Sequence, residues 1–144
     1  FEAQQSMIGQ LKHGLLAIFI AGALALLITN PALAQNFALA GYDANGNLDA
    51  DFGGDGKVTT SFGNGLNGSA TAIAVDSSGR VVAVGTVNSQ FALTRYKKDG
   101  SLDTTFGSGA GMVLTAFLNS YSASASAVAI DQQGRIVVAG TTTT

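Results

Sequence analysis

The second half of the chain repeats the first half, and this repetition constrains the fold more than any other feature. The segment FALTRY at residues 91–96 matches FALAGY at residues 37–42, at an offset of 54 residues. GRIVVAGT at residues 134–141 matches GRVVAVGT at residues 79–86, at an offset of 55. Repeats of this length are supersecondary units that bury their apolar faces by stacking on neighbouring copies. The sequence therefore predicts a modular fold.

The repeats are predicted at residues 35–90 and 91–144, with one inserted residue near Ala110. Alternation of apolar and polar side chains indicates half-buried strands at residues 37–42, 58–62 and 70–76. The run at residues 81–87 is apolar on both faces and favours a strand that is covered on both sides. We find no helical periodicity with caps in these repeats. The predicted fold class is all-β, with antiparallel four-stranded meanders.

Four short antiparallel strands per repeat are typical of a β-propeller blade. One complete blade would contain, from its inner to its outer edge, the strands at residues 70–76, 80–87, 91–96 and 112–117. Residues 37–62 would form the outer half of a preceding blade, and residues 126–142 the inner half of the next. Because a propeller ring needs about four blades or more, the chain is predicted to be a partial β-propeller-like fragment. An open β-solenoid or a sandwich is the alternative.

Residues 7–34 have the three-part pattern of a secretory signal peptide. Lys12 supplies a positive charge, residues 14–29 form an uncharged apolar run, and ALA at residues 32–34 is a small-x-small cleavage site. The apolar run is shorter than the ~20 residues of a transmembrane anchor, which is the alternative. We predict an N-terminal hydrophobic signal helix, Sec-type export with cleavage after Ala34, and a secreted or cell-surface location, periplasmic or extracellular. Contact with the membrane is expected only during export.

The two ends of the chain are interpreted as those of a fragment. Residues 1–6 add nothing to the signal pattern, so we interpret them as read-through or an extension, with Met7 as the start. Residues 141–144 follow a strand pattern directly. Further repeats of the same chain are therefore expected as partners of the two repeats seen here.

Composition excludes several kinds of chemistry. Cysteine is absent, which removes disulfides and thiolate metal sites. The one histidine, His13, lies in the predicted signal, so the mature chain cannot supply a Ser-His-Asp triad or a histidine-ligated metal. Charged residues make up 11% of the chain and form no basic stripe, so no nucleic-acid partner is expected. We expect no enzymatic activity from these residues.

One loop carries a pattern of oxygen ligands. Alternating carboxylate and amide side chains surround a glycine, as in loops that bind calcium; they are Asp43, Asn45, Asn47 and Asp49. The spacing differs from that of an EF-hand, and Lys97 stands at the position of Asp43 in the second repeat. The alternative is an Asn-Gly turn with solvated aspartates. Calcium is the one cofactor considered, and otherwise none is expected.

Other polar and aromatic residues recur between the repeats. Asp76 and Asp131 occupy identical turns, which favours a structural role, since a catalytic residue is needed only once. A pair of carboxylates could also serve a glycosidase, but nothing in the sequence marks one of them as raised in pKa. Tyr42, Tyr96 and Tyr121 could line a sugar-binding face or pack at the blade edges.

The repeats resemble a known family. FALTRY, followed by DGSLDTTFG at residues 99–107 and GRIVVAG at residues 134–140, resembles the delta-60 repeat of bacterial cell-surface and secreted proteins. IAVDSSG at residues 73–79 is similar to NHL-type β-propeller blades. The resemblance covers residues 36–142 and implies long tandem arrays in exported proteins, with no implied activity. The first repeat departs from the pattern, because Gly41 stands where the second repeat has Arg95.

Together these features predict a secreted β-propeller-like repeat scaffold. Its expected role is extracellular binding or structural presentation, with an unknown glycan or protein as partner. The alternative is the N-terminal part of a secreted enzyme whose catalytic residues lie outside these residues. The complete open reading frame distinguishes the two, because a catalytic domain would favour the enzyme and further repeats the scaffold.

Overall fold

The computed structural model describes residues 16–20, 23–27, 34–63 and 65–144. The chain divides into two compact units, residues 1–33 and 34–144, and each is described by itself. The described residues form β-strands and one short 3₁₀ turn, η2 (Gly107–Gly109), and contain no α-helix. Accordingly, no helix in this part of the chain has the length and hydropathy needed to cross a membrane.

The first unit contains an antiparallel strand pair where the sequence predicts a signal helix. Strand β1 (Leu16–Ile20) pairs with β2 (Ala23–Leu27). The predicted N-terminal helix is therefore not supported by the described residues. The physical reason is that a short, continuously apolar run has no periodicity with which to distinguish a buried helix from a buried strand. Met7, Lys12 and residues 32–33 of the predicted cleavage site lie outside the described residues.

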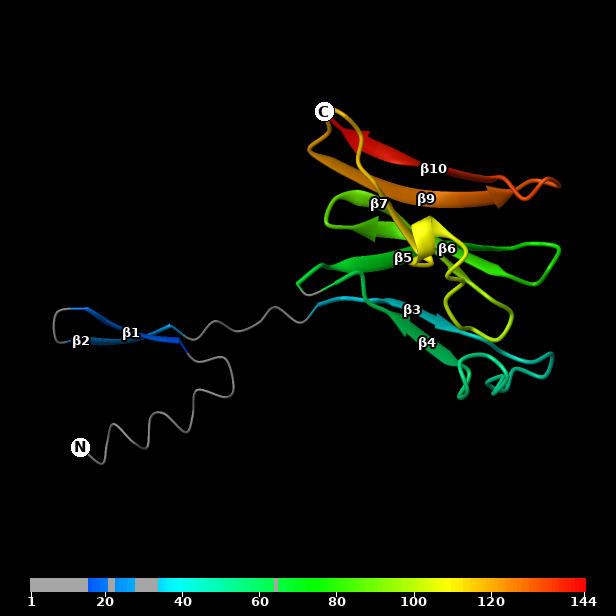
Figure 1. The fold of residues 1–144 in the computed structure, drawn as a ribbon, viewed down its shortest axis with the longest axis horizontal. Helices are drawn as coiled ribbons and strands as arrows, with labels where there is room; N and C mark the ends of the chain where they lie inside the picture. The colour runs from blue at the N-terminus through cyan, green and yellow to red at the C-terminus, as the bar shows by residue number, and fades with distance from the viewer. Residues whose placement is uncertain (1–15, 21–22, 28–33, 64) are drawn as a thin grey trace. The chain divides into compact units, whose positions relative to one another are not determined.

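The second unit consists of three antiparallel sheets. The sheets are the pair β3 (Phe37–Ala40) and β4 (Lys57–Thr60), the four strands β5 (Gly68–Val75), β6 (Val81–Val87), β7 (Gln90–Tyr96) and β8 (Met112–Thr115), and the pair β9 (Ser122–Ile130) and β10 (Ile136–Thr143). The central sheet has the order β5-β6-β7-β8. In Figure 1 it lies between the other two sheets, so the unit is a stack of layers.

This arrangement confirms the predicted antiparallel all-β class. The four strands predicted for one complete blade form one sheet in the predicted order. The half-blades predicted at residues 37–62 and 126–142 are the strand pairs β3–β4 and β9–β10. The observed strands differ from the predicted ones mainly at their ends; β8 stops at Thr115, whereas the sequence predicted a strand to residue 117.

Tight turns join β5 to β6 and β6 to β7 in the central sheet. The β5–β6 turn spans residues 76–80 and includes Asp76, which the sequence places in a turn; Gly79 has a φ of +77°. The β6–β7 connection is a two-residue loop of Asn88 and Ser89, with φ values of 44° and 63°. Positive φ at both central residues is typical of the tight hairpin turns that match the twist of the paired strands.

Both repeats carry a bulge at the same place. The pairing of β5 with β6 shifts between Ala70 and Ala72, and the pairing of β10 with β9 shifts between Ala139 and Gly140. A Cβ at Gly85 would collide with the carbonyl oxygen of Ser69, opposite the first bulge. Glycine is therefore required there by the close approach of the backbones, and Gly140 holds the matching position in the second repeat.

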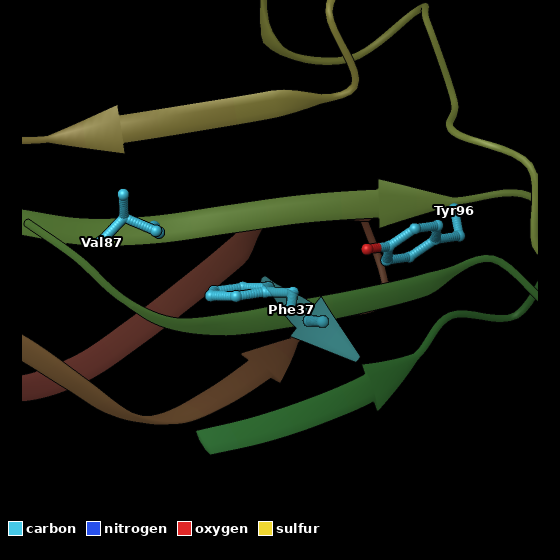
Figure 2. Packing of buried hydrophobic residues seen from close by; sticks show 5 residues of the cluster. Phe37, Val87 and Tyr96 are labelled. Atoms are coloured by element: carbon cyan, nitrogen blue, oxygen red, sulfur yellow. The ribbon is translucent and has the colours of Figure 1, made fainter. Parts of the chain in front are cut away.

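The apolar core lies in two clusters, one on each face of the central sheet. The cluster between the first and central sheets contains Phe37, Ala83, Val87, Ala92 and Tyr96. Figure 2 shows the Phe37 ring between Val87 and Tyr96. The second cluster, between the central and third sheets, contains Val82, Val84, Phe91, Ala123 and Ala125. Strand β6 supplies residues to both clusters, which confirms the prediction that it is covered on both faces.

Candidate functional site

The predicted calcium loop is a compact turn in which the Asp43 carboxylate accepts hydrogen bonds from residues of the same turn. Asp43 Oδ1 accepts hydrogen bonds from the backbone N–H groups of Asn45 and Asn47, both at 2.9 Å. Asp43 Oδ2 accepts a hydrogen bond from the Asn47 side-chain amide at 3.1 Å. The side-chain and backbone donors of Asn47 hold the pKa of Asp43 below its ordinary value. The geometry matches a turn in which an aspartate side chain caps the backbone.

Asp49, the fourth candidate ligand, makes contacts that are separate from those of Asp43. Asp49 accepts a hydrogen bond from the backbone N–H of Asp51 at 3.0 Å. It lines an open hollow of about 380 Å³ together with Asp51, Lys98 and Asp99, whereas Asp43 lies outside this lining. Within the described residues, no group of three acidic or histidine side chains is placed to hold a metal ion. The turn alone accounts for Asp43, and calcium binding stays a prediction.

An aspartate–arginine turn recurs in both repeats. Asp76 Oδ1 accepts hydrogen bonds from the backbone N–H of Ser78 and Arg80, and its Oδ2 accepts one from Arg80 Nε at 2.6 Å. Asp131 makes the same contacts with Gln133 and Arg135, with Arg135 Nε at 2.5 Å. These contacts support the predicted structural role of the two aspartates, because each carboxylate fixes the geometry of its hairpin.

These contacts also change the acidity of the two carboxyl groups. Burial opposes ionisation of Asp76, but hydrogen bonds from the backbone and side chain of Arg80 outweigh it, so the pKa falls below the ordinary value. The Arg135 side chain lowers the pKa of Asp131 in the same direction. Both aspartates are ionised at neutral pH and engaged by their own turns, which does not suit them to act as general acids.

A partly buried polar cluster around Asp103 is one that the sequence did not single out. Arg95 Nε donates to Asp103 Oδ2 at 2.8 Å, and Thr105 Oγ1 donates to Asp103 Oδ1 at 2.6 Å. Arg80 Nη1 lies 4.0 Å from the same carboxylate, and the Arg95 guanidinium lies 4.6 Å from the centre of the Phe106 ring. Asp103 is buried, and the hydrogen bond from Thr105 contributes most to lowering its pKa to about 2.

This cluster closes the long loop between β7 and β8. Its carboxylate accepts hydrogen bonds from two sides, and the arginine stacks on an aromatic ring, which orders the loop. The first repeat lacks the arginine: Gly41 takes its place, and a Cβ there would lie 3.0 Å from the Phe52 ring. A sequence signal for the arginine was therefore present, because the second repeat has Arg95 where the first repeat has Gly41.

The three tyrosines do not form one exposed face. Tyr96 is fully buried, and its hydroxyl lies 2.7 Å from Thr60 Oγ1, so it joins the first sheet to the central sheet. Tyr42 and Tyr121 are largely exposed. The structure thus assigns Tyr96 to packing and leaves the other two on the surface.

Comparison with known proteins points to the same architecture. A family model described as "Domain of unknown function (DUF5122) beta-propeller" matches residues 77–106, which is less than half of the chain. The matched segment runs from the aspartate–arginine turn through β6 and β7 to Phe106. No curated protein and no solved structure matches the chain. The match supports a β-propeller-like repeat, in agreement with the stacked sheets.

Proposed function

We propose that residues 35–144 belong to an exported β-propeller-like repeat scaffold, of the delta-60 kind, that binds or presents an extracellular glycan or protein. The observation that carries the proposal is the recurrence of packing contacts between the repeats. Phe37 meets Phe62 edge to face with ring centres 4.9 Å apart, and Phe91 meets Phe117 in the same way at 4.8 Å. Each ring pair joins neighbouring strands within one sheet, so the two repeats use the same residues for the same contact, as expected of a repeat scaffold.

The exposed turns differ between the repeats although their backbones match. The N–H of Asp43 donates to the carbonyl of Asn47 at 2.8 Å, and the N–H of Lys97 donates to that of Ser101 at 2.8 Å. The first turn carries an aspartate and two asparagines, and the second carries Lys97, Lys98 and Asp99. A constant frame with variable charged turns is suited to presenting binding groups, because loops on a rigid scaffold commonly carry recognition.

Binding is tested with the purified unit of residues 34–144 on an array of glycans and on extracellular protein extracts. We expect a ligand that binds more weakly when the exposed turns at residues 43–47 and 97–101 are changed, for example in Lys98→Ala. The matched control is Lys57→Ala, which removes an exposed lysine that does not line the hollow. Equal effects of the two substitutions would contradict recognition by the turns. A catalytic domain in the complete reading frame would favour the enzyme alternative.

Export is tested separately by fusing residues 7–34 to an alkaline phosphatase that is active only outside the bacterial cytoplasm. We expect the fusion protein to have phosphatase activity and a mature N-terminus at Gln35. Replacing Ala32 and Ala34 with aspartate removes the small residues of the cleavage site and should leave the signal attached. A cytoplasmic, uncleaved wild-type fusion would contradict export.

A further inference from the structure

Two sheets of the second unit each have a strand with an unpaired edge. Among the described strands, β3 pairs only with β4, and β10 pairs only with β9. An unpaired edge presents a row of backbone N–H and C=O groups that can template pairing with another strand. The two edges are at opposite ends of the layered stack (Figure 1).

The chain itself contains the template for joining these edges. In the central sheet, β6 pairs with β7 along its whole length, from Val81 opposite Tyr96 to Val87 opposite Gln90. Strand β10 is the repeat counterpart of β6, at an offset of 55 residues, and β3 is the counterpart of β7, at an offset of 54. The free edge of β10 therefore corresponds to the edge of β6 that pairs with β7. The free edge of β3 corresponds to the edge of β7 that pairs with β6.

We propose that β10 of one copy pairs with β3 of a second copy of this chain, giving a composite sheet in the order β9-β10-β3-β4. The central sheet sets the register of this pairing. Transferred by the repeat offsets, it places Ile136 opposite Tyr42, Val138 opposite Ala40, and Gly140 opposite Ala38 of the second copy. The partner is a second copy because each edge fits the sequence of the other.

An apolar surface next to β3 would be covered by this pairing. An open, mainly apolar groove of about 370 Å³ is lined by residues 38–41 with Phe52, Ile73 and Val81. Ile73 is 60% exposed, whereas its counterpart in the second repeat, Val128, packs against the central sheet. An incoming β9–β10 pair would cover Ile73 as the central sheet covers Val128.

The incoming pair has a matching exposed side chain. Val137 on β10 is 64% exposed, whereas its counterpart Val82 on β6 is buried under the third sheet. In the composite sheet, Val137 would be buried against β5 of the second copy, which is the counterpart of β9. Two apolar side chains that are exposed in one copy, Val137 and Ile73, would thus be removed from water together.

A hydrogen bond within the chain also has a counterpart in the proposed interface. Within the chain, Tyr96 and Thr60 form a buried hydrogen bond between adjacent sheets. Their repeat counterparts are Tyr42 and Thr115, which are both exposed in one copy. In the assembly, the Tyr42 hydroxyl of the second copy would reach Thr115 Oγ1 of the first.

The symmetry of this contact determines the assembly. Because the surfaces that meet are different, the interface is heterologous and produces a closed ring or an open filament. Each copy supplies one complete sheet and two half-sheets, which is equivalent to two blades. Since propellers hold about 4 to 8 blades, a closed ring would contain about two to four copies.

Cysteine cross-linking tests the register directly, because the chain contains no cysteine of its own. The unit of residues 34–144 is suitable, since it contains both apolar clusters. We expect Ala40→Cys mixed with Val138→Cys to form a disulfide between two chains under mild oxidation. Ala38→Cys with Val138→Cys is the off-register control. Equal cross-linking of the two mixtures would overturn the proposed pairing.

Sedimentation over a range of concentrations tests the assembly without cross-links. We expect the wild-type unit to reach about two to four times the monomer mass if the ring closes. Val137→Lys should weaken association by about 10-fold or more, because it would bury a charge. The control is Leu118→Lys, because Leu118 is 95% exposed and takes no part in the proposed interface. This substitution should change the association by less than about 2-fold.

Loss of the tyrosine hydroxyl gives a milder test of the same interface. Tyr42→Phe should weaken association by roughly 2- to 10-fold, as expected for one hydrogen bond. A wild-type unit that stays monomeric, or equal effects of Val137→Lys and Leu118→Lys, would overturn the proposal. The proposal rests on the fold and its repeat contacts, so this failure would leave export and ligand binding to be judged by their own experiments.

Discussion

At the scale of single residues, the chain uses aspartates to build turns. Asp43, Asp76 and Asp131 each accept hydrogen bonds from backbone N–H groups two and four residues later. Asp76 and Asp131 add an arginine partner from the same turn. The exposed Asp131–Arg135 pair should contribute little to the free energy of unfolding, since solvent screens it. The main effect of these contacts is to fix hairpin geometry.

Asp103 should make the stability of the unit depend on acid pH. Its pKa is lowered from 3.8 to about 2 in the folded chain, so its contribution is present above 3.8 and is lost as the pH falls through that value toward about 2. Urea midpoints measured at a series of pH values should decrease across this window. Asp103→Asn should be less stable at neutral pH and should flatten this part of the profile. An unchanged profile in the variant would contradict the role of Asp103.

Gly85 should tolerate no side chain. Its φ is ordinary, but a Cβ would collide with the Ser69 carbonyl, so Gly85→Ala should lower the free energy of unfolding by about 3 kcal/mol. Gly134→Ala is the control, because Gly134 has a φ of +77° and open space around its Cβ position. It should cost about 1 kcal/mol from backbone strain alone. Chemical denaturation measures both, and equal losses would contradict the close approach.

At the scale of elements, the sequence predicted the strands and their order in the central sheet, but not the side-chain contacts between sheets. Alternation in residues 70–76 and the two-sided apolar run of residues 81–87 indicated strands β5 and β6, because burial on one or both faces leaves a direct pattern. The β6–β7 turn was not predicted as a defined turn, since Asn88-Ser89 lacks the glycine of the strongest hairpin signals. Short apolar segments such as Leu16–Ile20 carried no distinguishing period.

The polar contacts of the candidate site were the hardest part to predict. The Arg95–Asp103 pair joins residues eight positions apart across a bridge between Tyr96 and Leu102, and no local period shows such a contact. The Tyr96–Thr60 bond joins the two repeats and depends on how the sheets stack. A position-by-position comparison of the repeats identifies Arg95, because the first repeat has Gly41 there. It does not identify Asp103 as the partner of Arg95.

The Tyr96–Thr60 hydrogen bond should couple the first sheet to the central one. Tyr96→Phe leaves the buried Thr60 hydroxyl without this partner and should cost about 1 to 2 kcal/mol of unfolding free energy. Thr60→Val should cost a similar amount, and the double variant less than the sum of the two. Denaturant titrations of the four proteins give the coupling. Strictly additive losses would show that the two side chains do not interact.

The turn at residues 43–47 should fold without calcium. Its carboxylate already accepts three hydrogen bonds from the turn itself, so we expect the same melting temperature with calcium and with a chelator. A rise in melting temperature with calcium that Asp43→Asn abolishes would instead establish the calcium site. Calorimetry of the unit of residues 34–144 makes this comparison.

At the scale of the whole second unit, stability comes from stacking. The two apolar clusters lie between sheets, and each contains residues from both repeats. Thr71 Oγ1 on β5 adds a hydrogen bond of 2.7 Å to the carbonyl of Ala125 on β9. Loss of one inter-sheet anchor should therefore affect more than its own strand, as in other arrays stabilised by contacts between neighbouring repeats.

Phe37→Ala tests this dependence on stacking. Phe37 is fully buried between the first and central sheets, so its truncation should cost about 3 to 5 kcal/mol of unfolding free energy. Phe117→Ala, at the partly exposed ring paired with Phe91, should cost less. Thermal melts and urea titrations of the two variants measure the difference. Equal and small losses would contradict a core between the sheets.

A nuclear Overhauser spectrum of residues 34–144 shows whether the repeats form layers packed face to face. We expect cross-peaks between the Phe37 ring and the Val87 methyl groups, which join the first and central sheets. We also expect cross-peaks between the Phe91 ring and Gly140, which join the central and third sheets. A spectrum with cross-peaks only within each strand pair or sheet would contradict the layered repeat fold.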